Sequence, residues 1–373
     1  MPFRSRFVAS PLAALALLAA SGLPASASAS ADPPSQNTHL RPWVKLCLTL
    51  KRMPGHRHIR CKYPPANPNP RAERRAHALR TPSMSEISIP TNPATPVGIT
   101  SGPDDNLWFT ENYANKVAKV TTGGLFTEYS LPNAVSEPAH ITTGPDGALW
   151  FTEAIGNRIG RITTSGTITE YELPTENAYP WGITVGPDDA LWFTEIDANK
   201  IGRITTGGSI TEYSLPTSGA YPCLITTGPD GKLWFTQALA QSVAKMTTTG
   251  TVTEYGAPSN DAMPIGIVTG PDGNLWYTDG AGRVGKVTTS GSFTEYAVGD
   301  PDSFPWGITL GPDDNLWFAE QVGSNIASVT TSGTVSEYPT TTSIAGPFQL
   351  AVGSDDNLWA TLDYVDKLAV VTP

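Results

Sequence analysis

Hydrophobic and polar residues alternate over short stretches from Pro96 to the C-terminus, and residues typical of turns separate these stretches. In one unit the alternating runs are Ile183 to Val185, Leu191 to Glu195, Ile201 to Thr205 and Ile210 to Leu215, which predict four strands. Pro and Gly stand between the runs, where the missing donor of Pro and the freedom of Gly disrupt no strand pairing. The pattern therefore predicts an all-β fold that is rich in turns.

The unit repeats along the chain, and a Leu-Trp pair marks each copy at a spacing of 41 or 42 residues. A repeat of this length with four strands is typical of a β-propeller, in which each repeat forms one blade. Because blades pack on both faces, we expect both sides of the Leu-Trp strand to belong to the core. The tryptophans are Trp108, Trp150, Trp192, Trp234, Trp276, Trp317 and Trp359, and they predict seven blades.

The two ends of the repeat region complement each other. The last unit ends at Pro373 after its third strand and has no fourth strand of its own. A segment with the fourth-strand pattern, Ser85-Glu86-Ile87, stands before the first unit instead. We therefore predict that residues 84–89 supply the outer strand of blade seven, which pairs an otherwise open edge and makes 83–373 one propeller.

The first 31 residues have the pattern of an export signal. Arg4 and Arg6 precede an apolar run from Leu12 to Ala20, and Ala-x-Ala sites follow between residues 25 and 31. This order is typical of a secretory signal peptide, residues 1–31, so we expect a secreted, extracytoplasmic protein. No later stretch has 18 consecutive apolar residues, and the sequence therefore predicts no transmembrane segment.

Residues 32–82 form a basic, proline-rich arm with eleven Lys or Arg, two acidic residues and nine prolines. Such a composition predicts an extended linker. Its charge is compatible with an anionic cell-envelope partner, and equally with a solvated tether. Within the arm, Cys47 and Cys61 stand at equal distances from Pro54, so a hairpin turning at Pro54-Gly55 would place them opposite each other. We predict a Cys47–Cys61 disulfide.

The net charge of −10 is the sum of very unequal parts. The signal peptide carries +2, the arm +9 and residues 83–373 carry −21. An acidic propeller is a poor partner for nucleic acid, so we expect none for this part of the chain. Nothing in the sequence calls for an oligomer, and we expect a monomer.

Strand order predicts where a site lies. In an antiparallel blade the start of the first strand lies beside the end of the second. The residue after each Pro and the last residue of each second strand therefore share one rim of the central channel. Five carboxylates there would face mostly apolar neighbours, which suits a small-molecule or peptide-like ligand with apolar bulk and a cationic or metal-bridged group. Alternatively, each acid only bonds the backbone of a neighbouring loop. The expected ligand-binding residues are Trp181, Trp306, Phe348, Glu111, Glu195, Asp279 and Glu320.

His140 is the one histidine of the predicted propeller. It lies on a first strand at the same rim, where other units have glycine, as in Gly98 and Gly182. Imidazole is the side chain best suited to proton transfer near neutral pH, so His140 and the neighbouring Glu153 are candidate catalytic residues. A purely structural histidine is the open alternative.

The repeat, seen in 144–153, 157–166 and 167–174, resembles that of the streptogramin B lyase (virginiamycin B lyase) family from Pro96 to Pro373. The resemblance implies a seven-bladed propeller that opens a cyclic depsipeptide at an ester by elimination. It also implies a histidine as general acid and base and Mg²⁺ held through glutamate. Glu153 and Glu320 are the candidate metal ligands.

The resemblance breaks at the catalytic positions. The family has its catalytic histidines directly after the Pro in the last two blades, and Trp306 and Phe348 stand there in this chain. The associated acid is matched by Glu320 in blade six but by Leu362 in blade seven. His140 lies one residue beyond the post-Pro position, where strand alternation turns a side chain to the opposite face.

Three functions follow from these patterns. The first is an exported propeller that binds a ligand without the family's catalytic histidine. The second is an Mg²⁺-assisted carbon–oxygen lyase with His140 as a relocated base. The third is a scaffold that contacts the cell envelope through the basic arm.

Overall fold

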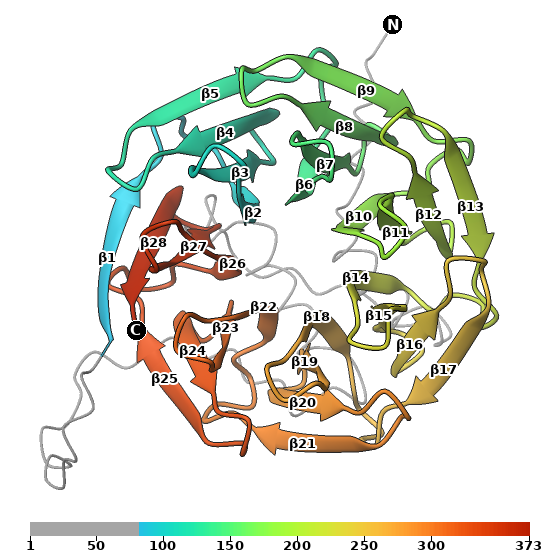
Figure 1. Cartoon of the computed structure of the whole chain (residues 1–373). Helices are drawn as coiled ribbons and strands as arrows, with labels where there is room; N and C mark the ends of the chain where they lie inside the picture. Colours follow the sequence, from blue (N-terminus) through green and yellow to red (C-terminus); the bar gives the residue numbers. More distant parts are fainter. Residues whose placement is uncertain (1–81) are drawn as a thin grey trace, which may run out of the picture. The chain divides into compact units, whose positions relative to one another are not determined.

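The computed structural model describes residues 82–373 and forms them into 28 strands without a helix. The strands make seven four-stranded sheets arranged in a ring (Figure 1), which confirms the predicted all-β, seven-bladed propeller. Within these residues, no helix is long and apolar enough to cross a membrane. The signal peptide, the arm up to residue 81 and the Cys47–Cys61 pair lie outside the described residues.

Each blade runs from an inner first strand to an outer fourth strand. The first strands are β2 (Pro96–Ser101), β6 (Pro138–Thr143), β10 (Pro180–Val185), β14 (Pro222–Thr227), β18 (Pro264–Thr269), β22 (Pro305–Leu310) and β26 (Pro347–Val352). The second are β3 (Leu107–Glu111), β7 (Leu149–Glu153), β11 (Leu191–Glu195), β15 (Leu233–Gln237), β19 (Leu275–Asp279), β23 (Leu316–Glu320) and β27 (Leu358–Leu362). The third are β4 (Lys116–Val120), β8 (Arg158–Ile162), β12 (Lys200–Ile204), β16 (Ser242–Met246), β20 (Arg283–Val287), β24 (Asn325–Val329) and β28 (Lys367–Thr372). The fourth are β5 (Phe126–Ser130), β9 (Ile168–Glu172), β13 (Ile210–Ser214), β17 (Val252–Gly256), β21 (Phe293–Ala297), β25 (Val335–Pro339) and β1 (Ser83–Ser88).

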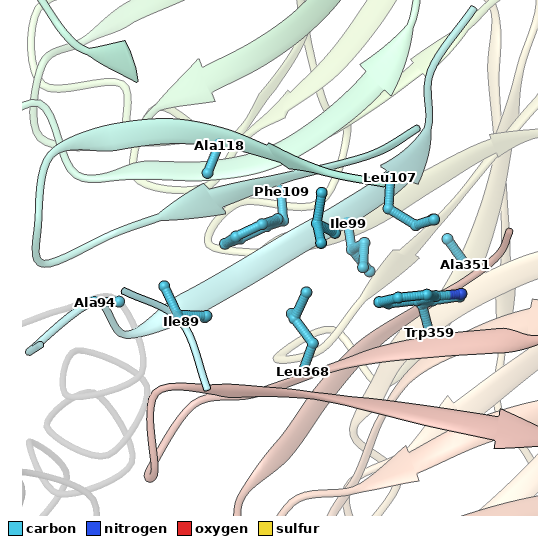
Figure 2. Packing of buried hydrophobic residues seen from close by; sticks show 10 residues of the cluster. Ile89, Ala94, Ile99, Leu107, Phe109, Ala118, Ala351, Trp359 and Leu368 are labelled. Carbon is cyan, nitrogen blue, oxygen red and sulfur yellow. The ribbon is translucent and has the colours of Figure 1, made fainter. Parts of the chain in front are cut away.

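Second strands are buried on both faces because a blade packs against each side. In blade one, Leu107 and Phe109 pack toward blade seven and its Trp359 (Figure 2). Trp108, on the opposite face, packs in a cluster with Leu149 of blade two. The prediction that both sides of the Leu-Trp strand belong to the core is confirmed.

Strand β1 closes the ring beside β28, the last strand of the chain (Figure 1). The pairing runs from Ser83 to Ser88, one residue earlier than the predicted range 84–89. Glu86 in β1 also accepts hydrogen bonds from the Thr342 amide (2.8 Å) and hydroxyl and from the Lys367 ammonium (3.0 Å). Burial would raise the pKa of Glu86, but these bonds outweigh it and lower the pKa to about 2. The N-terminal strand is thus bound to blades six and seven by charge as well as by pairing.

The antiparallel register gives each blade two ends. One end gathers the starts of strands one and three and the ends of strands two and four, as in Pro180 opposite Glu195 and Glu195 opposite Lys200. We call this side of the ring the proline face, after the Pro that begins each first strand. The other side carries the tight turns between strands one and two and between strands three and four, and we call it the hairpin face.

The hairpin face repeats one arrangement in every blade. The indole Nε1 of each second-strand tryptophan donates to the first Asp of the preceding turn, as Trp192 does to Asp188 at 2.8 Å. In blade three Arg203 donates to the other oxygen of Asp188 at 2.7 Å. The seven pairs are 108–104, 150–146, 192–188, 234–230, 276–272, 317–313 and 359–355.

A ring of threonines joins neighbouring blades. The hydroxyl of Thr194 in β11 accepts from the Gly182 amide (2.9 Å) and donates to the Cys223 carbonyl of the next blade (2.7 Å). Blade six departs from this pattern because Ala319, fully buried, takes the threonine position and supplies no hydroxyl.

Candidate functional site

Four aromatic side chains from first strands meet at the proline face, around the centre of the propeller. Trp306 of β22 and Phe348 of β26 stack with centroids 4.5 Å apart. Trp181, from β10 on the other side of the ring, lies 6.5 Å from Trp306 and 6.4 Å from Phe348. His140 of β6 contacts Trp181 edge-on at 5.1 Å. We call His140, Trp181, Trp306 and Phe348 the aromatic cluster.

The aromatic cluster is buried, although its members come from four different blades. The exposed fractions are 5% for His140 and Trp181 and 2% for Trp306 and Phe348. The resemblance associates the post-Pro positions of blades six and seven with catalytic histidines. In this chain buried aromatic side chains, Trp306 and Phe348, occupy both positions.

His140 joins this cluster, and simple alternation along the strand did not predict that. Every first strand has a register shift after its Pro, between Pro138 and Ile141 in β6. Such a bulge changes which face the following side chains occupy. His140 consequently meets Trp181 and Phe348, which stand directly after a Pro.

The His140 imidazole has no partner for its Nε2 atom among the described residues. Burial lowers the pKa of His140 to about 3, because the charged form loses its hydration. The ring is therefore neutral at physiological pH and keeps one nitrogen unbonded.

The acidic residues predicted at the rim stand at the ends of second strands and are buried there. Glu111 and Glu195 are fully buried, and neither has a hydrogen-bond partner for its carboxylate oxygens among the described residues. Burial, together with the Glu128 charge, raises the pKa of Glu111 to about 8. Burial and Glu212 do the same for Glu195. The structure places both beside outer-strand glutamates of their own blades.

Three other blades have a different residue at the end of the second strand. In blade four Gln237 donates to Glu254 at 2.9 Å and accepts from Ser242 at 2.6 Å. In blade five Asp279 accepts from the Met263 amide (2.8 Å) and from Arg283 (2.8 Å). Blade seven has the apolar Leu362.

The candidate metal ligands Glu153 and Glu320 belong to blades two and six and are both fully buried. Glu320 already accepts from Ser303 (3.1 Å) and Asn325 (2.8 Å). The charges acting on Glu153 are those of Glu170 and Arg158. Within residues 82–373, no three His, Cys, Asp or Glu side chains gather as a metal site would need. These residues do not fit a shared magnesium ion, and we derive no step through one.

Further contacts of the aromatic cluster were not predicted from the sequence. Gln321 accepts a hydrogen bond from the Trp306 indole at 2.9 Å and has an unpartnered Nε2 in the described part of the chain. Tyr179 packs against Trp181 at 6.1 Å. Each stands next to a position that the repeat did single out, the end of a second strand and the Pro of a first strand.

The fold and the proline face together define a seven-bladed propeller whose first strands converge on a central site. The chain belongs to the virginiamycin B lyase family, whose model matches residues 82–371.

Solved structures agree with this family. A streptogramin B lyase has 35% identity and a TM-score of 0.75, over 78% of this chain and 97% of that one. A catalytically inactive His-to-Ala variant of virginiamycin B lyase from Staphylococcus aureus, solved with quinupristin, has 37% identity and a TM-score of 0.76, over 79% and 100%. Hydrazine synthase from Kuenenia stuttgartiensis shares only the fold, with 17% identity and a TM-score of 0.63 over 76% and 97%.

Proposed function

We propose that this chain is an exported, ligand-binding member of the virginiamycin B lyase family that does not open the ring of its ligand. The ligand is small or peptide-like and binds at the proline face. The aromatic cluster carries this proposal, because Trp306 and Phe348 fill the positions that the resemblance associates with catalytic histidines.

Two further observations support binding without turnover. Indole and phenyl rings have no group that takes a proton from carbon, so Trp306 and Phe348 cannot act as the catalytic base at these positions. A relative that is catalytically inactive through loss of one histidine was solved with quinupristin, so a propeller of this family holds a ligand without processing it. Export rests on the signal-peptide pattern of residues 1–31.

The test uses the purified full chain and quinupristin, with magnesium present. Calorimetry measures binding, and liquid chromatography separates the cyclic antibiotic from its linear isomer, since elimination breaks the C–O bond without adding water. We expect binding with the cyclic form intact. Ring opening above the rate without protein would overturn the proposal.

A lyase with a relocated base is the second candidate, and His140 is the observation that favours it. Its unpartnered Nε2 is in the neutral, proton-accepting form. A base with a pKa of about 3 is weak, however, because a general base works best with a pKa near the operating pH. If turnover is seen, His140→Ala should abolish it, and turnover that survives this change would exclude His140 as the base.

A further inference from the structure

The loops of the proline face contain no basic residue. They are the segments that follow the second and fourth strands, and they hold eight acidic residues and neither Lys nor Arg. The acidic residues are Glu137, Glu176, Asp197, Asp261, Asp300, Asp302, Asp363 and Asp366.

The basic residues nearest to these loops are already paired. Five third strands begin with Lys or Arg at the proline face, and each of these residues forms an ion pair with a described carboxylate. Lys116 binds Glu128 at 2.7 Å, and Lys200 binds Glu212 at the same distance. Arg283 also binds one of the loop acids, Asp261, at 2.8 Å. The basic side chains that begin these third strands are thus bound to carboxylates other than Glu137 and Asp197.

Glu137 and Asp197 bring this negative charge next to the aromatic cluster. Neither forms an ion pair with a described residue, and burial raises the pKa of both carboxyls. Both charges act on the buried Tyr179 and add to the rise in its pKa that burial causes. Tyr179 in turn packs on Trp181. Unpaired carboxylates beside aromatic rings are the chemistry that recognises an organic ammonium group.

Apolar side chains are exposed on the same face. Five of the six large exposed hydrophobic residues in the described part of the chain lie in its loops. Four of them follow one arc of the ring, through blades six, seven, one and two: Val322 (43% exposed), Ile344 (43%), Tyr113 (72%) and Val135 (67%). The arc ends at blade two, where Glu137 lies.

We propose that the ligand of the proline face is a cationic, amphipathic peptide. Its apolar side chains lie on the arc, and its ammonium groups lie at Glu137 and Asp197. Charge complementarity selects this occupant, because neither Glu137 nor Asp197 forms an ion pair with a described residue, and the described loops of this face contain no Lys or Arg. This inference rests on the proposed function and adds the requirement for positive charge.

The test compares two forms of one cyclic peptide in calorimetry with the full chain. Gramicidin S has apolar side chains and two ornithine ammonium groups, and acetylation of the ornithines removes both charges. We expect gramicidin S to bind and the acetylated form to bind about tenfold more weakly or worse. Binding of gramicidin S should also weaken between about 20 mM and about 500 mM salt.

Variants locate the charges that matter. Glu137→Gln with Asp197→Asn should weaken gramicidin S binding about five- to tenfold and leave the acetylated peptide unaffected. The matched control, Asp189→Asn with Asp314→Asn, removes two exposed charges from the hairpin face and should change neither affinity. Melting curves show whether each variant is folded.

Equal affinity for the two peptide forms, no binding of gramicidin S, or an equal loss in the control variant would overturn the inference. Quinupristin binding that is independent of salt and of Glu137 and Asp197 would leave the proposed function standing while this inference fails. Charge-dependent binding of gramicidin S without any binding of quinupristin would support the inference and exclude the antibiotic as a ligand.

Discussion

The two faces of the propeller are built from the same repeats but differ in how far the repeats agree. On the hairpin face every blade has the same tryptophan-to-aspartate hydrogen bond, as in Trp192 and Asp188. On the proline face the post-Pro position changes from blade to blade among Val, Ala, Trp, Cys, Ile and Phe. The position at the end of the second strand changes among Glu, Gln, Asp and Leu.

The difference separates folding from function. A contact that appears in all seven blades serves something that all blades need, which is burial of an indole with its N–H satisfied. Residues that differ between otherwise equal blades break the symmetry of the ring and create a surface with one particular shape and charge. The proline face, with the aromatic cluster at its centre, is that surface.

The largest effect is expected from opening the ring that carries both faces. Deleting residues 83–90 removes β1, exposes the edge of β28 and releases the bonds of Glu86 to Thr342 and Lys367. Loss of the buried Ile89 and the half-buried Met84 and Ile87 side chains should cost roughly 5 kcal/mol or more in the free energy of unfolding. Thermal melting measures this loss. Glu86→Gln, which keeps the strand, should lower the melting temperature far less, and a deletion that melts like the wild type would contradict closure by β1.

The next effect depends on pH and distinguishes blade three from blade four. The pKa of Glu195 rises on folding from 4.5 to about 8, so the folded state holds this proton more tightly. The stability that this proton contributes is fully present below pH 4.5 and is lost as the pH rises toward 8, by about 1.4 kcal/mol for each unit between the two pKa values. Glu195→Gln should reduce the fall of melting temperature with rising pH between about 5 and 9 by the share of this one group, while Glu111, whose pKa is also about 8, retains its own share.

Blade four supplies the reverse control for that prediction. Gln237 holds the equivalent position with a bond to Glu254, so Gln237→Glu should steepen the fall in stability with rising pH. If Glu195→Gln left the pH profile unchanged, Glu195 would be solvated or paired and the described burial would be contradicted.

A smaller loss is expected from the repeated contact of the hairpin face. Asp188→Ala leaves the indole N–H of Trp192 and the Arg203 guanidinium without their acceptor. An unsatisfied buried donor costs about 1–3 kcal/mol, which chemical unfolding would detect. Ligand binding at the proline face should be unchanged, as should the stability of the neighbouring Asp189→Asn variant. A change in affinity without a change in stability would refute the division between the faces.

The smallest effect is a gain. Ala319→Thr places a hydroxyl where the other blades have one, between the Gly307 amide and the Phe348 carbonyl. One such hydrogen bond should add about 1 kcal/mol to the free energy of unfolding. Thr194→Val, which removes the hydroxyl in blade three, should act in the opposite direction. Destabilisation by Ala319→Thr would show that blade six has no room for the hydroxyl.

The sequence predicts the hairpin face and the ring better than the proline face. The Leu-Trp spacing defines the blades, and the Ser85-Glu86-Ile87 pattern predicts the closing strand to within one residue. These predictions succeed because alternation and turns are local and repeat seven times. The bulge after each Pro does not interrupt the alternation of the sequence. The contact between His140 and Trp181, which depends on this bulge, could therefore not be predicted.

The candidate site is also harder to predict because its members come from opposite blades. The sequence places Trp181 and Trp306 at equivalent positions, but only the closed ring brings their centroids within 6.5 Å. It likewise places Glu195 at the rim, whereas the packing of blades buries this carboxylate completely. Distances across the ring depend on blade number and tilt, which single strands do not encode.

Hydrogen exchange of the backbone amides with and without quinupristin tests the central claim most directly. We predict slower exchange in the loops of the proline face, above all in residues 131–137, 196–199 and 321–324. We predict no change in the turns of the hairpin face, such as residues 186–190. Protection confined to the hairpin face, or spread evenly over both faces, would contradict the assignment of function to the proline face.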